Sequence, residues 1–131
     1  MTKEEELLTK VLCEQFPYGV QVYGNYRYHD GDKIVDDERV GVIKLSTLDW
    51  FFNGIEIKPY LRPMSSMTEE ERIEYNIIKC SICPDEPDDY AGFVDWLNAH
   101  HFDYRGLIEK GLAIAAVGED NPYKKKGGNN G

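Results

Sequence analysis

The sequence has no apolar run that comes near the ~20 residues a membrane-spanning helix needs. Its first six residues, Met-Thr-Lys-Glu-Glu-Glu, are acidic where a secretion signal would be basic. Cysteine is scarce as well: the chain has three, and an odd number argues against a closed disulfide framework. From these absences we expect a cytoplasmic protein without a membrane partner.

Positive charge is also in short supply. Fifteen Lys and Arg residues face 24 Asp and Glu residues, so the chain is acidic, with a net charge of −9. This charge repels the phosphates of duplex nucleic acid at long range, and we do not expect a duplex as the partner. Hydrophobic residues make up 41% of the 131 residues, and nine are tyrosines, which is enough to build a single folded core.

No catalytic or cofactor signature is visible. Cys80 and Cys83 have the spacing of half a zinc site, but zinc would need two further ligands. The imidazoles available are those of His29, His100 and His101, and neighbouring histidines on a helix point about 100° apart. We therefore expect neither a metal nor a cofactor, although the pattern alone leaves metal binding by the two cysteines open.

The first half of the chain predicts one helix followed by short strands. Thr2 and Glu5 have capping-box spacing before an amphipathic stretch that predicts a helix over residues 3–15. Residues 18–28 then alternate with a period of two, as a strand does. Further short strands are expected up to residue 58, with turns at 29–32 and 36–38, and with 48–52 as a strand before an Asn-Gly hairpin turn.

The second half predicts three helices. Thr68 with Glu71 can cap the first, and apolar residues at steps of three and four continue it to about residue 79. A second helix is expected from about residue 88 to the His100 region, and a third over 104–110, capped by Asp103. Residues 112–117 suit an edge strand, and 118–131 a flexible polar tail.

Together these elements predict an α+β fold. We expect a small antiparallel sheet or SH3-like half-barrel, flanked by an N-terminal helix and about three C-terminal helices. Residues 1–117 would form a single domain, and the tail would follow it.

Two blocks of the sequence, EIKPYLRPMSSMTEEE (residues 56–71) and DWLNAHHFDYRGLIEKGLA (residues 95–113), carry a resemblance. They resemble an uncharacterised family of small proteins from gut anaerobic bacteria and their prophages or mobile elements. The resemblance implies a phage or mobile-element origin. It implies no known activity, so no functional residue is carried over from it.

The second block holds the densest mixture of aromatic and ionisable side chains in the chain. Aromatic residues and arginine are enriched in the cores of protein interfaces. We therefore predict a non-enzymatic interaction protein, an adaptor or accessory protein of a phage or mobile element, that binds another protein. The candidate interface comprises Trp96, His100, His101, Asp103, Tyr104 and Arg105.

Two alternatives stay open, as does the oligomeric state. The first strand interleaves aromatic rings with arginine, as a surface that stacks nucleobases would. Its candidate residues for a small-ligand or nucleotide-binding protein, such as a defence-signal sponge, are Tyr23, Tyr26, Arg27 and Tyr28. The second alternative is a hydrolase in which His100 or His101 is paired with Asp103.

Overall fold

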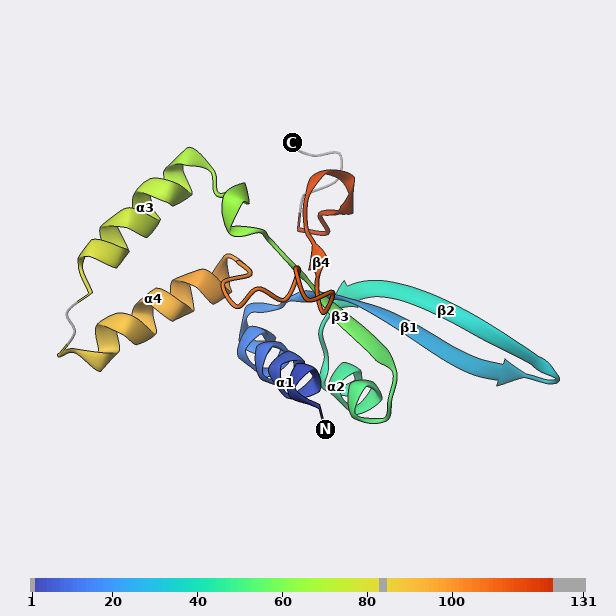
Figure 1. The fold of residues 1–131 in the computed structure, drawn as a ribbon. Helices are drawn as coiled ribbons and strands as arrows, with labels where there is room; N and C mark the ends of the chain where they lie inside the picture. Colours follow the sequence, from blue (N-terminus) through green and yellow to red (C-terminus); the bar gives the residue numbers. More distant parts are fainter. Residues whose placement is uncertain (1, 83–84, 124–131) are drawn as a thin grey trace.

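The structure, a computed structural model, describes residues 2–82 and 85–123, and it has the predicted α+β class (Figure 1). Its elements, in chain order, are α1 (Lys3–Gln15), β1 (Gln21–Asp30), β2 (Lys33–Val42), α2 (Leu45–Phe52), β3 (Glu56–Leu61), α3 (Glu69–Cys80), α4 (Pro87–Ala99) and β4 (Ile114–Ala115). Short 3-10 helices at Phe16–Tyr18 and Met64–Ser66 lie between these elements, and a third at Gly118–Asp120 follows β4. No helix in the described ranges has the length and apolar character needed to cross a membrane.

The sheet has four strands in the order β2-β1-β3-β4. β1 pairs antiparallel with β2 over its whole length, whereas β3 reaches only residues 22–25 of β1. The outer half of the β1-β2 hairpin therefore projects beyond the rest of the sheet, as Figure 1 shows on the right. β4 pairs parallel with β3, so the sheet is mixed rather than antiparallel as predicted.

The core lies between α1 and the base of the sheet. The predicted capping box of α1 is present, with the Thr2 hydroxyl accepting from the Glu5 amide and the Glu5 carboxylate accepting from the Thr2 amide. The apolar face of α1 packs against strand residues that are almost fully buried. The buried cluster comprises Leu8, Val11, Leu12, Val20, Val22, Ile43, Ile57, Leu61, Leu107 and Ala113.

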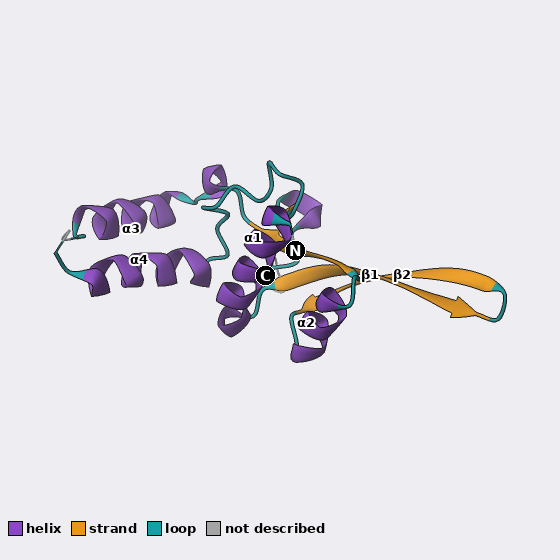
Figure 2. Cartoon of the chain, turned by 60° about the horizontal axis from the view of Figure 1, so that its bottom comes forward, coloured by secondary structure: helices purple, strands orange, loops and turns teal. Residues whose placement is uncertain are grey.

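α3 and α4 form a helical arm on the opposite side of the molecule from the hairpin (Figures 1 and 2). The two helices lie side by side through the ring of Tyr75, which is 5.5 Å from the ring of Phe93 and 6.1 Å from that of Trp96. The predicted capping box of Thr68 and Glu71 begins α3. No residue of α3 is buried, so this helix rests on its neighbours through a narrow contact.

Two predictions for the first half were wrong. Residues 48–52 belong to helix α2 rather than to a strand. The Asn53-Gly54 pair ends this helix: Asn53 Nδ2 donates to the Asp49 carbonyl at 2.7 Å, and Gly54 has a φ of 92°. The expected turn at 36–38 does not form either, because β2 runs unbroken beside β1.

The region after α4 also differs from the prediction. Residues 104–110 form turns rather than a third C-terminal helix, although Asp103 still accepts hydrogen bonds from the amides of Leu107 and Ile108 at 2.8 and 2.9 Å. Packing continues beyond residue 117, since the Tyr123 hydroxyl donates to the Tyr60 carbonyl at 2.7 Å. The expected tail from 118 therefore begins too early, and residues 124–131 lie outside the described residues.

Candidate partner-binding groove

An open groove of about 480 Å³ lies between the β1-β2 hairpin and α2. Figure 2 shows α2 below the base of the hairpin. Side chains of this helix line one side of the groove. The groove is lined by Val22, Tyr26, Arg27, Asp37, Arg39, Val40, Gly41, Val42, Lys44, Ser46, Thr47 and Trp50. Most of these residues come from the edge strand β2 and the first turns of α2, two elements that are adjacent in the sequence.

Local hydrogen bonds set the start of α2 and hence the wall of the groove. The backbone of Lys44 is extended, and its amide donates to Thr47 Oγ1 at 3.1 Å. The amide of Thr47 donates in return to the Lys44 carbonyl at 3.0 Å. This reciprocal pair turns the chain directly from β2 into the helix, which places Trp50 one turn further on, facing the hairpin.

Tyr26 and Trp50 form an aromatic contact across the groove. Their ring centroids are 5.5 Å apart with planes at 81°, the edge-to-face geometry that aromatic pairs prefer. Gly24 makes this possible, because a Cβ atom there would lie 2.6 Å from the Tyr26 ring. The Arg39 guanidinium lies 5.8 Å from the centre of the same ring. The groove therefore combines an aromatic pair, Tyr26 and Trp50, with the positive charge of Arg39 over the Tyr26 ring.

Large apolar side chains around the groove remain open to solvent. Val40 is 54% exposed, Val42 48% and Trp50 49%. Leu45, between two lining residues at the start of α2, is 76% exposed. Exposed apolar side chains that gather beside a concave surface with a polar rim are typical of an interaction site.

The charges of the groove are paired, apart from one cation. Arg39 contacts Asp37 at 2.7 Å, and Arg27 contacts Asp36 at 2.7 Å. The hydrogen bond that Arg27 donates to Asp36 also raises the pKa of the Arg27 guanidinium. Lys44 has no ion pair with any described residue. It therefore gives the α2 end of the groove an unmatched positive charge.

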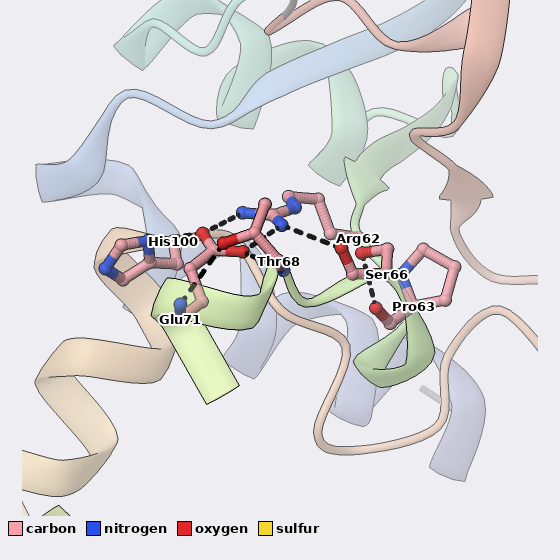
Figure 3. A network of polar contacts seen from close by, with 6 residues as sticks. All are labelled: Arg62, Pro63, Ser66, Thr68, Glu71 and His100. Carbon is pink, nitrogen blue, oxygen red and sulfur yellow. Dashed lines mark hydrogen bonds and ion pairs between the residues drawn. The ribbon is translucent and has the colours of Figure 1, made fainter. Parts of the chain in front are cut away.

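The predicted interface corner is occupied by contacts within the chain. The His100 ring lies 4.5 Å from the Trp96 ring, and its Nδ1 is 3.1 Å from a carboxylate oxygen of Glu71. Figure 3 shows His100 and Arg62 converging on that carboxylate from opposite sides. The Arg62 hydrogen bonds lower the pKa of Glu71 to about 2.

His101 holds an unusual backbone position at the end of α4. Its φ of 61° is left-handed, and the amides of His101 and Phe102 donate back to the carbonyls of Asn98 and Leu97. Its Nδ1 lies 3.0 Å from Gln15 Oε1, and its ring stacks on Tyr123 at 4.2 Å. Burial lowers the pKa of His101 to about 4, so the imidazole is neutral at pH 7.

The remaining corner residues also bind their own chain. Tyr104 donates its hydroxyl hydrogen to Asn98 Oδ1 at 3.0 Å, and Arg105 makes two hydrogen bonds to the Glu14 carboxylate at 2.7 and 3.0 Å. Asp103 accepts from two backbone amides rather than from a histidine. The hydrolase alternative requires one of the two imidazoles to pair with Asp103. The side-chain contacts of this part of the chain do not make that pair.

The alternative ligand face is only partly gathered at the groove. Tyr26 and Arg27 line the groove, as that alternative requires, but Tyr23 does not. Burial and the nearby Glu38 raise the pKa of Tyr23. The side chain of Tyr28 lies outside the described residues. Sequence reasoning missed Trp50, Val40 and Lys44; the available signal was that the apolar stretch at Leu45–Phe52 also suits a helix.

Metal chemistry finds no support within ranges 2–82 and 85–123, where no group of three or more His, Cys, Asp or Glu residues is placed to hold a metal ion. Cys80 is exposed and free, and Cys83 lies outside the described residues, so the Cys80–Cys83 pair remains untested.

Comparison of the chain with protein-family models, with curated proteins and with solved structures finds no match.

Proposed function

We propose that this protein is a non-enzymatic protein-binding module, and that its partner docks in the groove between the hairpin and α2. The observation that carries the proposal is the exposure of Trp50, Val40 and Val42 around one open concave surface. A half-exposed tryptophan is a typical anchor of a protein interface, and here Trp50 contacts the Tyr26 ring over which the Arg39 guanidinium lies.

The Trp96 to Arg105 corner has a different role in this proposal. Its side chains hold α1, α4 and the start of α3 together through the contacts of His100, His101 and Arg105. A partner that used these groups would first have to break those contacts, at a cost in the stability of the fold. The groove requires no such rearrangement.

Site-specific photocrosslinking tests the proposal. Benzoylphenylalanine is introduced in place of Leu45, which is 76% exposed beside the groove, and, as a matched control, in place of Ile77, which is 61% exposed on α3. Each protein is irradiated in a lysate of the source bacterium, and adducts are identified by mass spectrometry. We expect one dominant protein adduct from position 45 and none from position 77. Excess wild-type protein should reduce the adduct from position 45, whereas excess Trp50→Ala protein should not. Adducts from position 77 alone, or equal competition by Trp50→Ala, would contradict the proposal.

A small anionic ligand is the second candidate. The observation that favours it is the combination of Arg39 and Lys44 with the Tyr26 and Trp50 rings, since cations and aromatic faces together bind nucleotides. A defence-signal nucleotide would be one such ligand. Mass spectrometry of the small molecules released from the purified protein distinguishes the two: a bound nucleotide and no crosslinked protein would put this candidate first.

We also propose, on the sequence resemblance alone, that the protein derives from a phage or other mobile element. Its partner would then be encoded by the host or by the same element. We also propose that it acts in the cytoplasm.

A further inference from the structure

The outer edge of β2 is open along the groove. β2 is the end strand of the sheet, and no other strand in the described residues pairs with its far side. The Ile43 amide donates to the Val20 carbonyl at 2.9 Å, which marks this pair as hydrogen-bonded. Bonded pairs alternate in an antiparallel ladder, so Glu38, Val40 and Val42 direct their amide and carbonyl groups away from β1.

This edge lacks the usual protection at its α2 end. Exposed edge strands are ordinarily blunted by proline, by charges or by a covering element, because their free backbone groups recruit further strands. Here two half-exposed valines, Val40 and Val42, carry the free backbone groups, and Trp50 lines the same groove. An extended segment laid along β2 would gain backbone hydrogen bonds on one side and apolar contact on the other.

The charges along the edge distinguish between possible occupants. Asp36, Asp37 and Glu38 are consecutive, and antiparallel pairing with a second copy centred on them would set carboxylates opposite carboxylates. The net charge of −9 adds to that repulsion.

Glu38 and Lys44 have no ion-pair partner among the described residues. The six residue steps from Glu38 to Lys44 correspond to ~20 Å of strand, the length of a segment of about seven residues.

We propose that β2 binds an extended segment of the partner protein as an additional strand. The segment has apolar residues at its centre, an acidic side chain at the Lys44 end and a basic side chain at the Glu38 end. This inference rests on the proposed function and specifies its mode of recognition. The contact with Trp50 comes from side chains of the segment, and the specificity for extended backbone comes from the outward groups of Val40 and Val42.

Amide hydrogen exchange measured by NMR on the full chain tests the mode directly. The probes are two end-blocked synthetic peptides, Glu-Val-Thr-Val-Thr-Val-Lys and its reverse, which cover both orientations of an added strand. At ten times the Kd of the better peptide, we expect the amides of Glu38, Val40 and Val42 to exchange about tenfold more slowly. The amides of Arg39 and Gly41, already bonded to β1, should not change. Absence of binding by both peptides, or protection without this alternation, overturns the inference.

Two variants separate the backbone from the side chains. Val40→Pro removes an outward N–H, which an edge strand tolerates, and Val40→Thr is its matched control. We expect Val40→Pro to abolish peptide binding, Val40→Thr to keep it, and Lys44→Glu to weaken it. Circular dichroism checks that each variant is folded. The hydrogen-exchange test uses the wild-type chain, so it does not depend on the folding of any variant.

The same variants distinguish the two proposals in the crosslinking assay at position 45. If Trp50→Ala fails to compete and Val40→Pro competes fully, the groove binds its partner without strand addition, and only the inference fails. If both variants compete as well as the wild-type protein, the groove is not the binding surface and the proposed function fails with it.

Discussion

Arg62 holds both carboxylate oxygens of Glu71, through hydrogen bonds of 2.6 and 2.7 Å. The two side chains are 17% and 13% exposed, so the pair is partly shielded from water. The guanidinium also lies 4.4 Å from the centre of the Phe102 ring. This pair therefore joins the end of β3 to the first turn of α3, and it does so above the corner where α4 ends.

The pKa of Glu71, about 2 in the folded protein, predicts a loss of stability in acid. Because this pKa lies below the ordinary value of 4.5, the unfolded chain binds a proton first. The stabilisation is fully present above pH 4.5 and is lost as the pH falls towards 2, with an upper limit of about 3 kcal/mol. In urea titrations at several pH values, the difference in unfolding free energy between the wild type and Glu71→Gln should narrow across that window. A difference that does not vary with pH would show that the carboxylate is not held as the structure indicates.

His101 predicts a second and separate window. Its pKa falls from 6.5 to about 4 on folding, so protonation favours the unfolded chain. The contribution is complete above pH 6.5 and is lost as the pH falls through the range down to 4. His101→Asn retains a residue that tolerates the left-handed backbone but does not titrate. We expect its unfolding free energy to vary less with pH between 6.5 and 4 than that of the wild type, and an unchanged slope would assign the titration to another group.

Gly24 and Gly41 provide a matched pair for the groove. A Cβ at Gly24 meets the Tyr26 ring at 2.6 Å, whereas a Cβ at Gly41 meets no atom within 4 Å. Gly24→Ala should displace the ring from Trp50 and lower the unfolding free energy by about 1–3 kcal/mol, as overpacking does. Gly41→Ala should leave both the position of the Tyr26 ring and the unfolding free energy unchanged. Thermal unfolding and the tryptophan emission spectrum measure the two effects, and equal behaviour of the variants would show that the Tyr26 ring does not depend on Gly24.

Arg105→Ala tests whether the corner is structural. Removing the Arg105–Glu14 pair, whose side chains are 28% and 26% exposed, should cost about 1 kcal/mol of unfolding free energy. Crosslinking at position 45 should remain. A folded Arg105→Ala protein that no longer forms the adduct would return the interface to the corner.

Sequence reasoning located the helix starts because their signals are local. Thr2 with Glu5, and Thr68 with Glu71, need only three residues of spacing to be recognised. The stretch at 48–52 was misread because a short apolar run suits a strand as well as a helix. The Asn53-Gly54 pair that follows serves a hairpin turn and a helix end equally, since both need a residue of positive φ.

The aromatic corner was recognised as dense, but the nature of its contacts was not predictable. Arg105 binds a carboxylate 91 residues earlier in the chain, and His101 binds Gln15 across 86 residues. Sequence alone does not show such distant partners. It therefore does not distinguish a polar side chain that is exposed from one that is paired within the chain. The groove escaped prediction for a different reason: it exists because β2 is followed directly by helix α2, and residues 48–52 of that helix were predicted to form a strand.

The absence of buried residues in α3 determines how the molecule comes apart. A helix of this length is marginal alone in water, and α3 leaves Ile73 and Ile77 more than half exposed. Its backbone amides therefore open to solvent in a local unfolding reaction of lower free energy than the one that opens α1 and the base of the sheet. We therefore expect two cooperative units, in which α3 unfolds before α1 and the base of the sheet.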